Sequence, residues 1–200
     1  MNSLRLVRYG AWAAVAAVVV IAAALYFSPS KPVISEVTIG GPFTLVNQSG
    51  RTVTEADLAG HPSAIFFGFT YCPDVCPTAL QVMSTALDSL GARADRIQPI
   101  FITIDPERDT PENMAAYVKH FDERMVGLTG TPEQVRKAAD VYKVFYKKGQ
   151  GSGGADYLMD HTSVIYLMGP DGKFVGHFTH TTDSDKMAAE IARVLEQNGS

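Results

Sequence analysis

The two cysteines are the residues of this chain with the clearest capacity for chemistry. Cys72 and Cys76 lie in the segment TYCPDVCP, residues 70–77, and the 200-residue chain has 2 cysteines in all. Residues four apart share one face of a helix, so both sulfurs can point to one spot, and the N–H groups at a helix start favour a thiolate. Thiolates bind soft metal ions or attack disulfides. The pair therefore predicts copper binding or reversible oxidation. The alternatives are a structural disulfide that closes a small loop and two buried, inert thiols.

A third ligand would favour metal binding over redox chemistry. The chain contains 5 histidines, and His161 leads directly into an apolar segment, residues 162–168. A single histidine is more often a surface or hydrogen-bonded residue than a ligand. Spacing alone therefore assigns no role to His161.

The elements that must position these residues alternate between strand and helix patterns. The apolar run AIFFGF, residues 64–69, predicts a buried strand that ends just before Cys72, and a helical pattern follows over residues 78–90. Further strands are expected at 44–46, 52–54, 97–104, 162–168 and 174–179, and helices are expected to start after Thr110, Thr131 and Asp183. The glycine-rich segment 149–154 is expected to be a flexible loop. This alternation predicts one α/β domain.

Composition limits the class of protein. The chain is 46% hydrophobic and 19% charged, which is typical of globular proteins, and its formal net charge is −4. An acidic balance without a basic cluster argues against nucleic-acid binding. Two cysteines are too few for a fold built on disulfides.

The N-terminal segment has the pattern of a membrane anchor. Residues 9–27 form a run of 19 residues without a charge, preceded by Arg5 and Arg8. A helix of this length nearly spans a hydrocarbon core of about 30 Å, and the arginines favour a cytoplasmic N-terminus. A cleavable signal peptide is the alternative, although the run exceeds the usual apolar core of about 7–15 residues. We predict a cytoplasmic segment at 1–8, a transmembrane helix at 9–27, a linker at 28–34 and a domain at 35–200. A bacterial plasma (inner) membrane is the expected location, with the domain on the periplasmic side.

Three segments in order resemble the Sco/SenC family of copper-binding assembly factors for cytochrome c oxidase. They are TYCPDVCP at 70–77, FITIDPERDTP at 101–111 and DYLMDHTSVIYLMGPDGK at 156–173. The similarity extends over about residues 35–178, and the N-terminal anchor matches the layout of the family.

The resemblance implies a membrane-tethered, thioredoxin-like domain in which Cys72, Cys76 and His161 are the ligands of Cu(I) and Cu(II). Asp160 is then expected to orient the imidazole of His161 as a hydrogen-bond acceptor. Asp74 and Asp105 are further candidates for tuning the site. For Asp105, a salt-bridged loop that caps the next helix is an equal alternative.

The family has two proposed activities, and both use the two cysteines. One is delivery of copper to the binuclear centre of the copper-carrying subunit of cytochrome c oxidase, which also implies a copper donor. The other is reduction of the cysteines of that centre by thiol–disulfide exchange. We expect a copper metallochaperone rather than an enzyme, with the oxidoreductase as the alternative and a peroxidase-like enzyme as a distant third.

Overall fold

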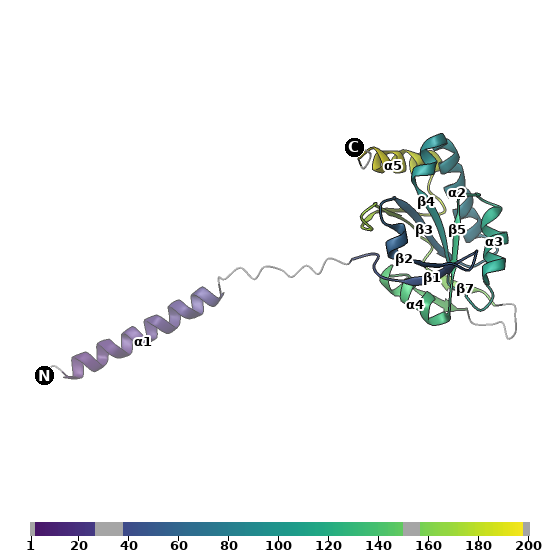
Figure 1. Ribbon diagram of the computed structural model, residues 1–200. Helices are drawn as coiled ribbons and strands as arrows, with labels where there is room; N and C mark the ends of the chain where they lie inside the picture. The colour runs from purple at the N-terminus through teal and green to yellow at the C-terminus, as the bar shows by residue number, and fades with distance from the viewer. Residues whose placement is uncertain (1–2, 27–37, 150–156, 198–200) are drawn as a thin grey trace. The chain divides into compact units, whose positions relative to one another are not determined.

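A computed structural model of the chain describes residues 3–26, 38–149 and 157–197, and the chain divides into two units, Met1–Val37 and Thr38–Ser200 (Figure 1). The predicted linker at 28–34 lies outside the described residues. Most of the predicted loop at 149–154 lies outside them too.

The described residues of the first unit form helix α1 (Ser3–Tyr26), which takes in most of the uncharged run. Within the part of the chain that the structure describes, no helix combines the length and apolar character that a membrane crossing requires. The predicted transmembrane helix is therefore not confirmed.

The second unit is built on a sheet with the strand order β2-β1-β5-β4-β3-β8-β9. Its centre consists of the parallel strands β3 (Ser63–Gly68), β4 (Gln98–Thr103) and β5 (Val126–Thr129). Antiparallel strands extend both edges: β8 (Ile165–Met168) and β9 (Phe174–Phe178) beyond β3, and β1 (Thr44–Asn47) and β2 (Thr52–Thr54) beyond β5. Two further strands, β6 (Tyr146–Lys148) and β7 (Met159–His161), pair with each other in a small separate sheet.

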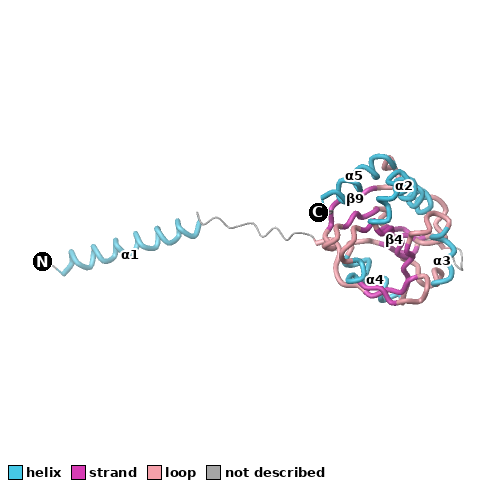
Figure 2. Tube along the Cα trace, turned by 45° about the horizontal axis from the view of Figure 1, so that its top comes forward, coloured by secondary structure: helices cyan, strands magenta, loops and turns pink. Residues whose placement is uncertain are grey.

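Helices lie on both faces of the large sheet. Figure 2 shows α2 (Val75–Leu90) and α5 (Ser184–Gln197), which pack together, on the side opposite to α4 (Pro132–Val141). Helix α3 (Pro111–Lys119) packs against β5, and the 3-10 helices η1 (Glu55–Leu58) and η2 (Gly91–Arg96) complete the unit. The predicted α/β class, with a central sheet flanked by helices, is confirmed.

The helix starts follow from local sequence. The hydroxyl of Thr110 accepts a hydrogen bond from the backbone N–H of Asn113, 3.3 Å away. Thr131 and Gln134 form a reciprocal capping box, and a proline begins each of these two helices. A carboxylate oxygen of Asp183 accepts two backbone N–H bonds at the start of α5. These caps satisfy donors that a helix start leaves without partners, so the three predicted starts are confirmed.

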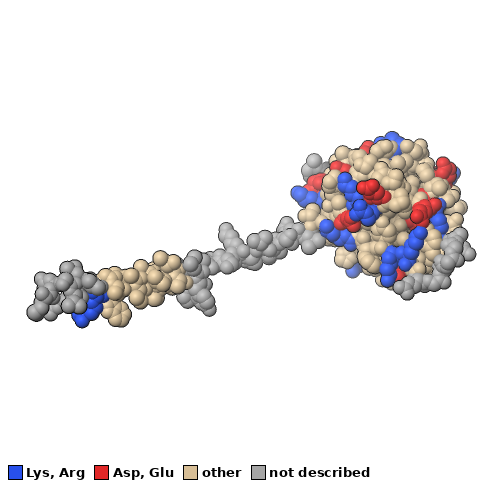
Figure 3. All heavy atoms as spheres, turned by 90° about the horizontal axis from the view of Figure 1, so that it is seen from below, with Lys and Arg blue, Asp and Glu red and all other residues tan. Residues whose placement is uncertain are grey.

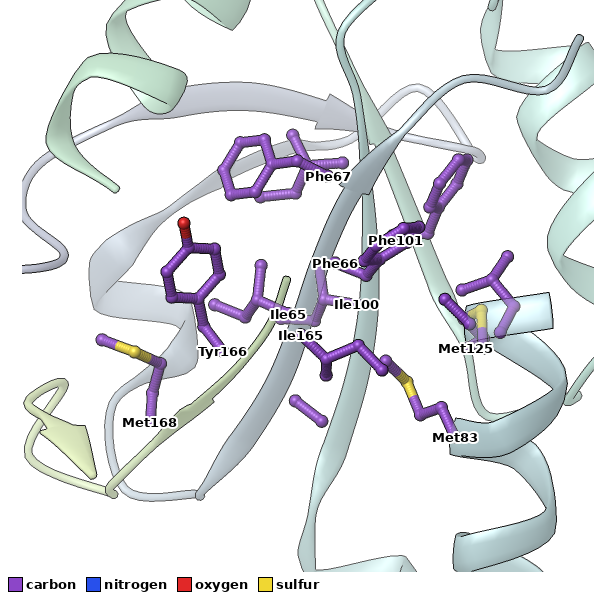
Figure 4. Close-up of a cluster of buried hydrophobic side chains, with 14 of the residues drawn as sticks. Ile65, Phe66, Phe67, Met83, Ile100, Phe101, Met125, Ile165, Tyr166 and Met168 are labelled. Carbon is purple, nitrogen blue, oxygen red and sulfur yellow. The ribbon is translucent and has the colours of Figure 1, made fainter. Parts of the chain in front are cut away.

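The hydrophobic core lies on both faces of the sheet. Every residue of the central strand β3 is therefore buried. Phe66 stacks on Phe101 with ring centroids 6.2 Å apart, whereas Phe67 packs edge-on against Tyr166 at 6.3 Å on the other face (Figure 4). Burial on both faces explains why this strand reads as a continuous apolar run rather than as an alternating one.

Five elements differ from the sequence prediction. Helix α2 begins at Val75, before the predicted start at residue 78, so Cys76 lies within the helix. The strand predicted over 162–168 starts only at Ile165, and β7 precedes it. The short strands β5, β6 and β7 were not predicted, because three or four residues give no periodic signal and, unlike β1 and β2, these strands are not joined to their partners by a short turn.

Charged side chains of both signs are intermingled on the face of the second unit seen in Figure 3. Within the described residues of the second unit, charged side chains form ion pairs, among them Lys148 with Glu107 at 2.7 Å and Arg136 with Asp140 at 3.1 Å. This face therefore has a mixed charge and no patch of a single sign.

Candidate metal centre

The cysteine segment follows the carboxyl end of β3 and leads into α2. Cys72 lies in a turn in which its backbone N–H donates to the carbonyl of Phe69 at 3.2 Å, and Asp74 is the N-cap of the helix. The prediction that both cysteines share a helix face is therefore wrong, because only Cys76 is helical. Instead, the backbone N–H of Cys76 donates to the sulfur of Cys72 at 3.4 Å. The first turn of α2 thus holds the sulfur of Cys72, which lies upstream of the helix.

The two thiols differ in acidity. Both are free, Cys72 half-buried and Cys76 buried. A hydrogen bond from the Cys76 side chain, with further bonds from the backbone N–H groups of Asp74 and Cys76, lowers the pKa of Cys72 from 9.0 to about 4. The adjacent Cys72 sulfur and burial raise the pKa of Cys76. Before any metal binds, Cys72 is therefore the thiolate and Cys76 the thiol that donates to it, with backbone N–H groups at the helix start as a smaller contribution.

His161 reaches the same point from the end of β7. Its Nδ1 atom lies 3.0 Å from the carbonyl oxygen of Thr162, and its Nε2 atom lies 3.6 Å from the sulfur of Cys76. A carbonyl can only accept, so Nδ1 carries the proton and the lone pair of Nε2 faces the sulfurs. This tautomer is the one in which Nε2 can bind a metal ion.

Two aromatic rings fix the imidazole plane. Phe66 and Phe69 approach the ring of His161 edge-on, with centroids 6.2 and 6.0 Å away. Both phenylalanines belong to the segment that leads to Cys72. The apolar strand therefore helps to orient the histidine as well as to position the cysteines.

The structure thus brings together the three residues that the resemblance singled out. One ligand atom from each of Cys72, Cys76 and His161 can be chosen such that all three lie within 4.8 Å of one another. Two soft sulfur donors and one imidazole nitrogen suit Cu(I) in a trigonal arrangement, and an added oxygen or nitrogen would suit Cu(II). The donor set therefore fits copper.

Gly68, the last residue of β3, makes room for the sulfur of Cys76. A Cβ atom at this position would lie 2.8 Å from that sulfur and 2.9 Å from the ring of Phe101. A side chain at residue 68 would therefore displace a ligand. The only sequence signal for this role is one glycine inside an otherwise apolar strand, which does not by itself point to the cysteine.

Asp160 does not have the role expected of it, whereas the tuning role expected of Asp74 stays a prediction. The exposed carboxylate of Asp160 pairs with Lys147 at 3.6 Å, and the Thr162 carbonyl takes the place beside Nδ1 of His161 that was expected for Asp160. The side chain of Asp74 is exposed, and its carbonyl accepts hydrogen bonds from the backbone and hydroxyl of Thr78. The backbone around the site, rather than these carboxylates, supplies the contacts.

Asp109 anchors the loop that carries Cys72, a role that sequence analysis did not assign. The side chain is buried and accepts hydrogen bonds from the backbone and hydroxyl of Thr70 and from the hydroxyl of Thr103. Burial is the main cause that raises the pKa of this carboxyl group. The end of β3 is therefore tied to the end of β4 two residues before the first cysteine.

Comparison with known proteins identifies the family. The family model described as SCO1/SenC matches residues 32–196. The mitochondrial protein SCO1 homolog of Homo sapiens is 44% identical over 156 residues, covering 77% of this chain and 52% of the human protein. The SCO2-like protein of Rickettsia felis is 39% identical over 179 residues, covering 86% of this chain and 85% of that protein.

Solved structures show the same fold. Bradyrhizobium japonicum ScoI with copper bound is 46% identical, with a TM-score of 0.74 over 78% of this chain and 99% of that one. Yeast Sco1 with copper bound is 37% identical, with a TM-score of 0.74 over 80% of this chain and 89% of that one. This likeness confirms the predicted thioredoxin-like fold.

The chain spans about half the length of several mitochondrial relatives that it matches, such as the human protein, of which it covers 52%. The matched part contains both cysteines and His161. By the family match and these identities, the chain belongs to the SCO1/SenC family.

Proposed function

We propose that this protein binds one copper ion through Cys72, Cys76 and His161 and acts as a copper carrier in the assembly of cytochrome c oxidase. The observation that carries the proposal is the convergence of two sulfurs and one imidazole nitrogen within 4.8 Å of one another. The copper-bound structures of similar proteins support it. The client is the copper-carrying subunit of the oxidase, and a separate protein supplies the copper.

The donor set favours copper over zinc. Cu(I) is satisfied by two or three soft ligands, whereas a structural zinc site needs four in a tetrahedron. Cys76 is buried and Cys72 and His161 are half-buried, so the ion would be held near the surface and within reach of a partner. Such a position suits transfer of the ion to another protein.

A thiol–disulfide oxidoreductase is the second candidate, favoured by the lowered pKa of Cys72. In this reaction the Cys72 thiolate attacks a disulfide of the client, which releases one client thiolate and forms a mixed disulfide. Cys76 then gives up its proton and attacks the sulfur of Cys72. The client leaves with both thiols reduced, and this chain is oxidised by two electrons to the Cys72–Cys76 disulfide.

Replacement of His161 separates the two candidates, because only copper binding uses the imidazole. His161→Ala leaves both thiols and the helix start in place. As a copper carrier, the variant should keep part of its Cu(I) affinity, since two thiolates can hold Cu(I) in linear geometry, and lose far more of its Cu(II) affinity. His177→Ala is the matched control, because His177 is an exposed residue of the edge strand β9.

The decisive readout is oxidase assembly in cells whose only copy of this protein is the variant. We expect oxidase assembly in His161→Ala cells to fail when copper is scarce and to recover partly when copper is abundant, and assembly in His177→Ala cells to be normal. Normal assembly by His161→Ala under copper limitation would contradict the carrier role and favour thiol reduction.

We also propose that residues 9–27 tether the protein to a bacterial plasma membrane, with the copper domain on the periplasmic side. The support is the uncharged run itself and the position of Arg5 and Arg8 before it. The expected result is that the full chain remains in the membrane fraction after an alkaline wash, whereas a chain that starts at residue 33 does not. Release of the full chain by the wash would contradict the tether.

A further inference from the structure

Arg108 lies at the centre of a cage of aromatic rings beside the candidate metal centre. The carbon of its guanidinium group is 3.7 Å from the ring centroid of Tyr157, 4.6 Å from that of Tyr71 and 5.8 Å from that of Phe69. Its side chain is only 13% exposed. Contacts between a cation and ring faces gain strength when water is excluded, so this cage holds the guanidinium firmly.

A buried carboxylate fixes both the cation and one wall of the cage. The side chain of Asp105 is 2% exposed and forms a salt bridge with Arg108. Its other oxygen accepts a hydrogen bond from the hydroxyl of Tyr157 at 2.6 Å. Because a buried carboxylate needs such partners, Asp105, Arg108 and Tyr157 stabilise one another. Asp105 thus belongs to a salt-bridged loop between β4 and α3, as the alternative expected, but it is buried and the cap of α3 is Thr110 instead.

The cage connects the two segments that bring the ligands together. Phe69 and Tyr71 belong to the segment that leads into Cys72, and Tyr157 lies four residues before His161. The link continues to the site itself, because Phe69 also packs edge-on against the ring of His161 at 6.0 Å. The guanidinium of Arg108 therefore contacts both the segment that carries Cys72 and the segment that carries His161.

We propose that Arg108 is a positioning residue that holds the His161 segment at the correct distance from the cysteine pair. The inference rests on the proposed copper site and adds a residue that acts on it through Tyr157 and Phe69. The cysteine pair has its own support, because the backbone N–H of Cys76 in α2 holds the sulfur of Cys72. Loss of Arg108 should therefore affect the contribution of His161 and leave the two thiolates in place.

Loss of Arg108 is therefore expected to lower the affinity for Cu(II) more than the affinity for Cu(I). Cu(I) can be held by the two thiolates alone, whereas Cu(II) depends on the imidazole nitrogen. Removal of a residue that supports a ligand typically weakens metal binding about 10- to 100-fold. Arg108→Gln should therefore lower the affinity for Cu(II) about 10- to 100-fold. It should also change the absorption and electron paramagnetic resonance signals of the Cu(II) complex. The affinity for Cu(I) should change much less.

The matched control is Arg124→Gln. Arg124 also pairs with a buried carboxylate, that of Asp122, which is 4% exposed, but the pair lies between α3 and β5. Both substitutions leave a buried carboxylate without its arginine, so both should lower the melting temperature of the metal-free full-length chain. Only Arg108→Gln should alter the Cu(II) signals. If this variant folds poorly, Arg108→Gln combined with Asp105→Asn removes the unpaired charge, and the same Cu(II) change is expected.

The measurement is Cu(II) and Cu(I) titration of the purified full-length chain and its variants. Wild-type Cu(II) affinity and spectra in a folded Arg108→Gln chain, or in the double variant, would overturn the inference. Equal losses of Cu(I) and Cu(II) would overturn it too, because they would indicate a general structural role. Failure of the proposed function has a different pattern: His161→Ala in an otherwise wild-type chain would then leave Cu(II) binding unchanged.

Discussion

The sulfur of Cys76 lies 3.6 Å from Nε2 of His161, although 85 residues separate them in the chain. Strands β3 and β8 pair in antiparallel fashion, so the end of β3 and the start of β8 share one edge of the sheet. Cys76 follows the first strand and His161 precedes the second. The topology of the sheet is therefore what creates the site.

The first prediction concerns Gly68, which makes room for the sulfur of Cys76. Gly68→Ala would place a Cβ atom 2.8 Å from that sulfur. Overpacking of this kind costs about 1–3 kcal/mol in the free energy of unfolding, and displacement of a ligand should weaken copper binding. Denaturant unfolding and copper titration measure the two effects.

Gly176→Ala is the control for this prediction, because Gly176 also lies in a strand and a Cβ atom there meets nothing within 4 Å. We expect this variant to keep the stability and copper affinity of the wild type. A Gly68→Ala chain with unchanged copper affinity would show that the sulfur position tolerates the added methyl group.

The second prediction concerns the reactivity of Cys72. Because the pKa of its thiol is lowered from 9.0 to about 4, Cys72 should remain a thiolate at neutral and mildly acidic pH. Its alkylation by iodoacetamide should proceed at nearly constant rate down to about pH 5, whereas an ordinary thiol slows about tenfold with each pH unit below its pKa. Tandem mass spectrometry, which distinguishes the two cysteines, should show Cys76 protected.

The lowered pKa of Cys72 should also make the free energy of unfolding rise with pH. A thiol whose pKa is lower in the folded chain than in the unfolded chain stabilises the fold at alkaline pH, and this contribution disappears as the pH falls towards about 4. Relative to Cys72→Ser, the reduced wild type should therefore gain stability as the pH rises from about 4 to about 9.

For the alkylation experiment, a rate for Cys72 that falls steadily below about pH 8 would contradict the lowered pKa.

The third prediction concerns the anchor of the cysteine loop. Thr70→Val removes the hydroxyl that donates to the buried carboxylate of Asp109 at 2.6 Å. A hydrogen bond to a charged group contributes about 1.5–3 kcal/mol, so the free energy of unfolding should fall by about that amount. Thr85→Val, at an exposed position of α2, should change it by less than about 0.5 kcal/mol. Equal stability of the two variants would contradict the anchoring role of Asp109.

Much of the fold could be predicted from the sequence because the signals are local. The caps at Thr110, Thr131 and Asp183 involve neighbours in the sequence, and the apolar run of β3 reflects burial on both faces. The cysteine pair was recognisable for the same reason, since both residues lie in one short segment.

The remainder of the site depends on contacts between distant segments. Spacing alone gave no role to His161, and only the resemblance to a family pointed to it. Neither the Thr162 carbonyl beside the imidazole nor the cage around Arg108 has a local signature, because each is created by tertiary packing. For the same reason, the expectation for Asp160 was wrong: its side chain is directed to Lys147 across the β6–β7 pair.

The measurement that tests the central claim most directly is the copper content of the reduced full-length chain after titration with Cu(I) and removal of weakly bound metal. We expect one copper ion per chain for the wild type and none for the variant that combines Cys72→Ala with Cys76→Ala, because no other cysteine is present. Unchanged copper content in the double variant would contradict the claim that these two sulfurs hold the metal.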